Sequence, residues 1–346
     1  MRRFQTIVII LCLAFYVWFL SHFGTRQVMH YIRLAGWGLV LTISLEAFAR
    51  FANTLGWWVT LGHYGDRVTM RELFGARVAG EAIDYLTPSQ VGGQFVMAMM
   101  VRRKLDMAAG LSTAVVASLC EMVGQVVFIV LALTLSLDMV PAARHLFWPV
   151  VGGFALALAL IAGYLLVQTR SPFTYLLRFA AKLPLRFETA QYEESAAEAD
   201  TILRDFYARH HARLFASSLF YVSAWALGPV EIYILLRLLH VRASFEVALL
   251  VEAVGMLIER ATFLLPAKLV SQEGGKALIF ALLGYPASIG FAIGFLRRIK
   301  EMAWVLFGMA ILTFHRMISE RAEPTGPRVR MHRVPGEDPL SGEESL

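Results

Sequence analysis

The stretch GEAIDYLTPSQVGGQ (Gly80–Gln94) is a hydrophobic segment that a proline and two adjacent glycines interrupt. The stretch IERATFLLPAKLVSQEGGK (Ile258–Lys276) repeats this pattern later in the chain. The separation along the chain between Pro88 and Pro266 nearly equals the separation between the last glycines of the two pairs, Gly93 and Gly275. Paired interrupted segments at corresponding positions in two halves of a membrane chain indicate the binding site of a transporter.

Proline and glycine give each stretch a physical reason to break. Pro88 and Pro266 lack a backbone N–H and disfavour helix at the residue before them. Glycine permits tight turns and close approach of backbone. The glycines concerned are Gly92, Gly93, Gly274 and Gly275. Irregular backbone is tolerated at membrane depth only where protein buries it or water reaches it. We therefore interpret residues 70–104 and 244–284 as re-entrant helical hairpins whose breaks face an interior site.

The composition is that of a polytopic membrane protein. The chain is 58% hydrophobic and 17% charged, with a mean hydropathy of +0.60, whereas soluble proteins are roughly 45–50% apolar and about 25% charged. The net charge of +6 does not indicate a nucleic-acid partner, because the basic residues cluster beside apolar runs, as at 102–104. Clusters of that kind anchor the cytoplasmic ends of membrane helices.

Apolar runs of about 20 residues cross a bilayer as helix, and they predict an all-α protein with about six full spans. The six runs lie at about 6–23, 36–62, 108–137, 145–167, 214–239 and 287–314. With a cytoplasmic amino terminus, residues 67–77, 102–104 and 168–213 fall on the cytoplasmic side, and the carboxyl terminus does too. We expect a membrane domain over 1–320, an interfacial cytoplasmic helix within 168–213, and a disordered tail over 321–346.

The span count predicts that the two interrupted regions form an inverted repeat. Repeat one covers about 36–137 and repeat two about 214–315, and three crossings separate their starts. Two hairpins of opposite orientation then meet near the midplane, as in alternating-access transporters. The alternative is a coincidence between proline and glycine kinks in ordinary helices. The shared register favours the repeat, because Glu121 and Glu301 follow the two breaks at nearly the same separation along the chain as the prolines.

Ionisable residues at membrane depth are costly, so they usually face an interior cavity and have a partner. Glu46 and Arg50 have the i, i+4 spacing of an ion pair. The acidic residues around the breaks are expected to line a substrate pathway, the alternative being hairpin mouths that are merely wet. These residues are Glu81, Asp84, Glu259 and Glu273.

The last span carries its own charged cluster of Arg297, Arg298, Lys300 and Glu301, too deep for easy snorkelling. The planar arginine fork suits a phosphate headgroup, so Arg297 or Arg298 is the expected contact. The alternative is structural, with Arg298 paired to Glu301 or to Glu121. Glu121 and Glu301 also suit the role of symmetry-related gates or proton-coupling groups.

At these residues the chain resembles the flippase-like membrane domain of lysylphosphatidylglycerol synthases and, within that family, the hopanoid-biosynthesis-associated membrane proteins. The resemblance covers about residues 36–315. It rests on the elements quoted above: Gly80-Glu81-Ala82 with Pro88 and Val91-Gly92-Gly93, Pro266 with Gln272-Glu273-Gly274-Gly275, and Arg297-Arg298 with Glu301. It implies a multi-span protein that moves or handles lipids in the bacterial cytoplasmic membrane, with hopanoid export as one suggested role.

Two departures put the headgroup specificity in doubt. Gln94 stands where the family tends to have an acidic residue, and Ala267-Lys268-Leu269-Val270 replaces a glycine-rich segment. The segment that follows the last span is too short for the aminoacyl-transferase domain of the synthases, so we do not expect synthase activity.

Three classes of function remain: a lipid flippase or transporter, a non-transporting scaffold for a lipid-biosynthetic complex, and an intramembrane enzyme. We favour the first and expect no enzymatic activity, because no protease dyad or nucleotide-binding fingerprint is present. No metal-ligand spacing occurs, so no metal or other cofactor is expected. The expected partners are membrane lipids and, in the scaffold interpretation, lipid-biosynthetic membrane proteins.

Overall fold

The computed structural model describes residues 33–87, 92–136, 147–168, 171–181, 193–261 and 272–322. Within these ranges every regular element is helical, which confirms the predicted all-α class. The long elements are α3 (Gly38–Leu61), α6 (Met107–Ser136), α7 (Phe147–Gln168), α14 (Ala287–Ala322), and the consecutive pair α10 (His211–Trp225) and α11 (Leu227–Leu238). The 3-10 helix η1 (Gly62–Arg67) follows α3.

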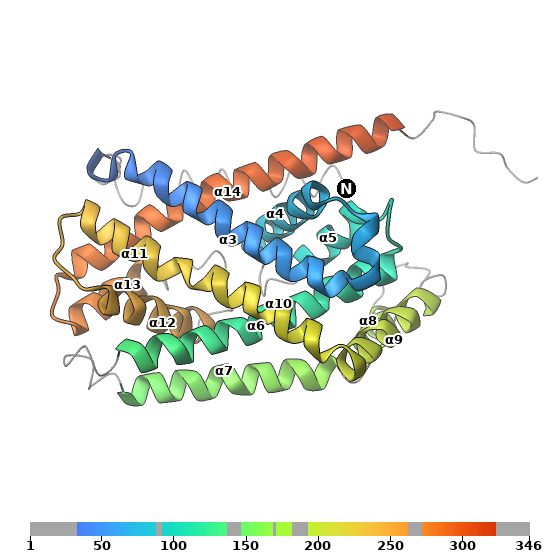
Figure 1. Cartoon of the computed structure of the whole chain (residues 1–346), viewed down its shortest axis with the longest axis horizontal. Coiled ribbons are helices and arrows are strands. Elements are labelled where there is room, and N and C mark those ends of the chain that lie inside the picture. Colours follow the sequence, from blue (N-terminus) through green and yellow to red (C-terminus); the bar gives the residue numbers. More distant parts are fainter. Residues whose placement is uncertain are drawn as a thin grey trace, which may run out of the picture.

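The long helices run along the long axis of the molecule, and the shorter helices fill its two halves (Figure 1). Helices α4 (Met70–Leu86) and α5 (Gly93–Val101) lie in one half, and α12 (Phe245–Ala261) and α13 (Glu273–Leu282) lie in the other. Helix α6 begins beside the first pair and α14 beside the second, so α6 and α14 run in opposite directions (Figure 1).

The first interrupted stretch breaks where its sequence predicts. A capping box begins α4, in which the Thr69 side chain accepts from the Glu72 N–H and the Glu72 carboxylate accepts from the Thr69 N–H. The helix ends at Leu86, and Thr87 has the extended backbone (φ −98°, ψ 137°) that a following proline favours. Helix resumes at Gly93.

The second interrupted stretch also folds as two helices, with α12 ending at Ala261 and α13 beginning at Glu273. A Schellman motif ends α13 and turns the chain into α14. Its left-handed residue is Gly284 (φ +81°), and the Tyr285 N–H donates to the Phe280 carbonyl at 2.9 Å. Pro88 and Pro266 lie outside the described residues; a separate helix lies on each side of both stretches.

Proline also explains the division between α10 and α11. Pro229 cannot donate to the carbonyl four residues earlier, so the helical ladder is disturbed where Ala226 separates the two helices. Together the two helices form the membrane-length element that the apolar run 214–239 predicts.

Three described elements are long and apolar enough to cross a membrane: α6, the joined α10–α11, and α14 as far as Ile318. The predicted spans at 36–62 and 145–167 correspond to α3, with 24 residues, and α7, with 22 residues. The predicted span at 6–23 and the tail at 323–346 lie outside the described residues. The total of six spans therefore stays a prediction.

The polar stretch 168–213 differs from the single interfacial helix that we predicted. It contains α8 (Pro172–Ala181) and α9 (Glu193–Arg209), which lie together at one end of the molecule (Figure 1). Asp200 of α9 holds the start of α8, since its carboxylate accepts from the backbone N–H groups of Phe173 and Thr174, each at 3.0 Å. Apolar residues of α9 such as Leu203 are buried in the same core as α6, so α9 belongs to the folded body.

Candidate functional site

We call the helix pair α4–α5 hairpin one and the pair α12–α13 hairpin two. A continuous series of ion pairs crosses the interior from one pair to the other. Acidic and basic side chains alternate along it, and six helices contribute them. We call these nine residues the charge chain; in order they are Glu121, Arg77, Glu81, Arg50, Glu46, Lys300, Glu231, Arg297 and Glu252.

The first part of the charge chain joins α6, α4 and α3. Arg77 is 3% exposed, and it donates through Nε to Glu81 and through Nη2 to Glu121, both at 2.6 Å. Arg50 of α3 contacts Glu81 as well and lies 3.1 Å from Glu46 one helical turn away. The predicted Glu46–Arg50 pair is therefore confirmed, but as one link of a longer series.

The second part joins α3 to α14, α11 and α12 through Lys300. The ammonium nitrogen of Lys300 lies 2.8 Å from a carboxylate oxygen of Glu46 and 2.8 Å from one of Glu231. Arg297 then binds Glu252 with two nitrogens, at 2.5 and 3.0 Å, and its Nε is 3.1 Å from Glu231. Lys300 thus connects the two halves of the molecule.

A second group of polar residues surrounds the break between α12 and α13. Arg298, which is 2% exposed, binds Glu273 at the start of α13 with two nitrogens. Gln272 donates from its amide to Glu301 at 3.0 Å, and Lys276 lies 3.7 Å from Glu259. This group therefore fastens α13 to α14 and to the end of α12.

Arg260 links the second break to α6. Its Nε donates to the Gln125 side-chain oxygen at 2.7 Å. The guanidinium thus joins α12 to the helix that also carries Glu121.

Glycine permits the two helices of hairpin one to meet beside the break. A side chain on Gly93 would place its first carbon 2.6 Å from the Gly80 carbonyl oxygen, which is too close for any other residue. The Gly93 N–H donates to the Asp84 carboxylate at 2.6 Å. In hairpin two the corresponding neighbours are Gly275 and Ile258. A Cβ atom on Gly275 would lie 3.2 Å from the Ile258 side chain.

The structure brings together most of the residues that the sequence singled out. Glu81 and Glu121 meet at Arg77, whereas Glu301, Glu273 and Arg298 gather at the second break. Gly274 is solvent-exposed, unlike Gly275.

Two expectations about partners and position need correction. Arg77 belongs to the buried interior and not to a cytoplasmic surface, because α4 continues inward and its Glu81 and the Glu121 of α6 bind it. Arg298 is paired with Glu273, a partner that the spacing within α14 did not indicate.

Glu231 and Glu252 are site residues that the sequence pattern did not single out. Glu231 is the one acidic residue of α11, and Glu252 stands between the apolar stretches 247–251 and 253–258 of α12. That isolation was a usable signal, since a charge in such a run needs an interior partner.

The alternation of charge is what makes the burial possible. An isolated charge loses several kcal/mol on leaving water, and a well-placed partner offsets most of that cost. Each of the four bases in the charge chain contacts two carboxylates, while cation–π contacts add to the packing, with Arg50 over Trp304 at 4.9 Å and Arg77 over Tyr221 at 5.6 Å. Within the described part of the chain, no group of three or more His, Cys, Asp or Glu side chains is placed to hold a metal ion.

Interrupted helices, buried charges at their breaks and apolar membrane-length helices define a class of multi-span membrane protein with a polar interior. The model of the lysylphosphatidylglycerol synthase TM region matches residues 5–308, and the chain belongs to that family. It is thus a membrane protein linked to lipid metabolism. No curated protein and no solved structure matches the chain.

Proposed function

We propose that this protein moves a lipid between the two leaflets of the bacterial cytoplasmic membrane, with a phospholipid or a hopanoid-type lipid as substrate and with both termini in the cytoplasm. The charge chain is the observation that carries the proposal. Nine ionisable residues in the interior are weak evidence for a stabilising role alone, because apolar residues of similar volume often pack there equally well. A polar headgroup crossing between leaflets needs such a route.

The two hairpins supply the alternating gates, arranged as an inverted repeat. Three observations support this arrangement: α6 and α14 run in opposite directions, the hairpins occupy opposite halves (Figure 1), and corresponding residues meet inside each hairpin. Gly80 meets Gly93 in the first, and Ile258 meets Gly275 in the second. Rocking of one unit against the other then opens the interior to each leaflet in turn.

Arg297 and Arg298 remain the proposed contacts for an anionic headgroup. Both guanidinium groups bind carboxylates, so a lipid phosphate binds by taking the place of Glu252 or Glu273. One charge-assisted bidentate contact then replaces another of similar strength. The carboxylates keep the arginines compensated while no lipid is bound.

Lipid translocation by the purified protein in proteoliposomes tests this function. Fluorescent glycerophospholipids and radiolabelled hopanoids are followed in parallel, and at least one of them is expected to cross in wild-type vesicles. Arg297→Lys and Arg298→Lys keep the charge but lose the second nitrogen contact, so each is expected to slow translocation of an anionic lipid.

The matched control is Arg237→Lys, since Arg237 is an exposed arginine near the end of α11. Its expected translocation rate is that of the wild type. If both interior variants, and the double variant, transport an anionic lipid at the full wild-type rate, the phosphate contact is wrong and a neutral sterol-like substrate takes its place.

A non-transporting scaffold for a lipid-biosynthetic complex is the second candidate, and one observation favours it. Every arginine of the charge chain contacts carboxylates, and paired charges of this kind also fix a rigid structure. Movement of neither lipid class in folded wild-type protein supports the scaffold, and copurification with lipid-biosynthetic membrane proteins then identifies its role.

A further inference from the structure

Two carboxyl groups beside the helix breaks differ in their contacts from the ion-paired carboxylates of the interior. Seven interior carboxylates touch a lysine or arginine: Glu46, Glu81, Glu121, Glu231, Glu252, Glu259 and Glu273. Asp84 and Glu301 touch no basic side chain in the described part of the chain, and each lies beside a helix break. The charges of these two groups are therefore not compensated in the way that holds the rest of the interior together.

Asp84 lies in the last turn of α4 and accepts only from a backbone donor, the Gly93 N–H at 2.6 Å. The second Asp84 oxygen, Oδ2, also lies against Gly93. It occupies the position that the Cβ atom of any other residue would need there. The charged groups that face it are Arg77 and Glu81 of its own helix and Glu121 of α6.

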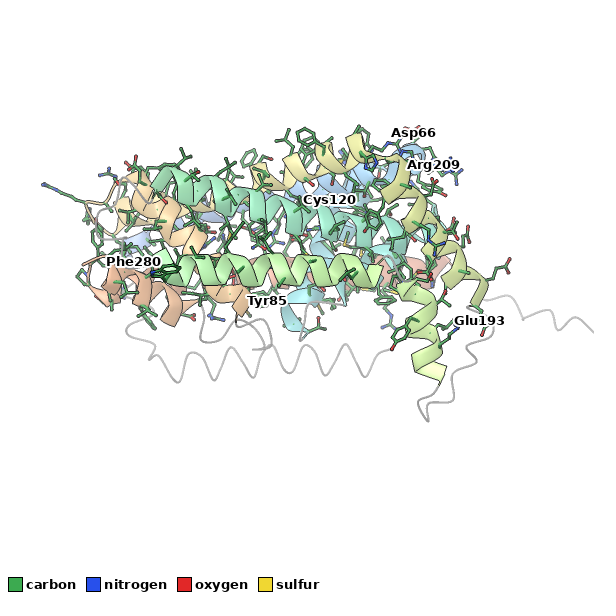
Figure 2. All side chains as sticks on the ribbon, turned by 90° about the horizontal axis from the view of Figure 1, so that it is seen from below. Asp66, Tyr85, Cys120, Glu193, Arg209 and Phe280 are labelled. Atoms are coloured by element: carbon green, nitrogen blue, oxygen red, sulfur yellow. The ribbon has the colours of Figure 1, made fainter. Side chains whose placement is uncertain are left out.

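Glu301 lies near the middle of α14, where three buried polar atoms gather without hydrogen-bond partners. Its Oε1 accepts from Gln272 at 3.0 Å, but its Oε2 has no partner. The Gln272 side-chain oxygen also has none. The Tyr85 hydroxyl makes no hydrogen bond of ordinary geometry, but it faces Glu301 and is a donor as well as an acceptor. Figure 2 shows Tyr85 near the middle of the long axis, between Phe280 towards one end and Asp66 at the other.

The charged neighbours of Glu301 come from α13 and from its own helix. They are Glu273 and Lys276 of α13 and Arg297 and Arg298 of α14. All four have a carboxylate or guanidinium partner of their own. Glu301 thus sits in a charged surrounding without a direct partner for its second oxygen.

A proton satisfies this arrangement, whereas a metal ion does not. A protonated Oε2 becomes a donor that the Tyr85 oxygen accepts, whereas an ionised Oε2 accepts from the Tyr85 hydroxyl, so the site holds the carboxyl in either state. Metal cations of the calcium or magnesium type need about six oxygen ligands. At both carboxyls an N–H donor already occupies one oxygen, from Gly93 at Asp84 and from Gln272 at Glu301.

We propose that Asp84 and Glu301 are proton-binding sites, one at each helix break, and that lipid movement is coupled to their protonation. This inference rests on the proposed function. Each carboxylate takes one proton from water on one side of the membrane, forming an O–H bond, and releases it to water on the other side when its hairpin opens there. The proton neutralises the carboxyl while the break is closed and dry, and thus removes the cost of an uncompensated buried charge.

Infrared spectroscopy of the purified protein tests proton binding without any lipid transport. Wild type is expected to show carbonyl stretching bands of buried carboxylic acids that titrate with pH. Glu301→Gln and Asp84→Asn are each expected to remove one band, and the double variant both. The matched control, Glu72→Gln, changes an exposed carboxyl at the start of α4 and is expected to leave both bands intact. Absence of such bands over the whole pH range, or their survival in the double variant, overturns the proposal.

A pH gradient across proteoliposomes tests the coupling. A gradient of one pH unit is expected to shift the steady-state leaflet ratio of the labelled lipid by about tenfold for each proton carried, and thus by about a hundredfold when both carboxyls carry one, because one pKa unit of free energy is a factor of ten. In the double variant of Glu301→Gln and Asp84→Asn the ratio is expected to stay near one. If lipid crosses in the wild type but its leaflet ratio does not change with the pH gradient, the coupling is wrong and the proposed function still holds. If no lipid crosses, the proposed function fails, and the infrared bands still decide whether the two carboxyls bind protons.

Discussion

The two hairpins form ion pairs of opposite polarity with the long helices beside them. In the first, the hairpin helix α4 supplies the base Arg77 and the long helix α6 supplies the acid Glu121. In the second, the hairpin helix α12 supplies the acid Glu252 and the long helix α14 supplies the base Arg297. The two helix pairs are thus fastened to their long helices by ion pairs of opposite polarity.

The halves also differ in how closely their helices approach. A side chain on Gly110 of α6 would lie 3.3 Å from Ala98 of α5, an approach that a small shift relieves. A side chain on Gly290 of α14 would overlap the backbone carbonyl group of Lys276 in α13. At these glycines α13 therefore packs more closely on α14 than α5 packs on α6. If one hairpin moves more than the other, this difference points to the first.

The largest effect is expected where the two halves join. Lys300→Met leaves Glu46 and Glu231 facing each other without the ammonium that lies 2.8 Å from each. Loss of one partner from a buried pair costs about 3–5 kcal/mol, since the remaining charge is uncompensated. Thermal unfolding in detergent micelles measures the loss.

The control for this substitution is Lys104→Met, which removes a lysine whose pair with Glu72 is largely exposed, with side-chain exposures of 39% and 46%. Exposed pairs contribute about 0–1 kcal/mol. Similar melting temperatures for the two variants contradict the view that the charge chain joins the halves.

An intermediate effect is expected at the helix contacts. Gly290→Ala forces α13 away from α14 and is expected to cost about 1–3 kcal/mol, as overpacking does in a filled core. Gly110→Ala is expected to change stability by under about 1 kcal/mol, because the gain of replacing a helical glycine offsets a slight shift of Ala98. Unfolding of both variants in the same micelles measures the difference. A larger cost at Gly110 reverses the ranking of the two hairpins.

The sequence predicted the features that single residues impose locally. Proline predicted where α4 ends, and Thr87 shows the reason, since its extended backbone is what the next residue requires. The i, i+4 spacing of Glu46 and Arg50 predicted their pair. The all-α class followed from composition and from the length of the apolar runs.

The partners that come from distant parts of the chain were beyond the sequence. Lys300 and Glu46 are 254 residues apart, and Arg77 and Glu121 are 44 apart. Nothing in the spacing of α14 indicates that Arg298 selects Glu273 of α13 and not a residue of its own helix. Periodicity identifies which face of a helix is apolar, but it does not identify which helix packs against that face.

The smallest effect is expected at the entrance of hairpin one, where the charged pair lies outside the interior. Although partial burial acts to raise it, hydrogen bonds from Lys104 and Thr69 hold the pKa of Glu72 below its usual value of 4.5. A carboxyl whose pKa is lowered by folding stabilises the folded state above its unfolded value, and this contribution is lost as the pH falls through the folded pKa. Below about pH 4.5 the wild type is therefore expected to lose the stabilising contribution of the Glu72 carboxylate. The Glu72→Gln variant has no such contribution at any pH. The difference at neutral pH is expected to be under about 1 kcal/mol because solvent screens the pair. Melting curves of both proteins across the acid range measure this difference in stability. If Glu72→Gln loses as much stability at neutral pH as Lys300→Met does, burial does not decide how much an ion pair contributes.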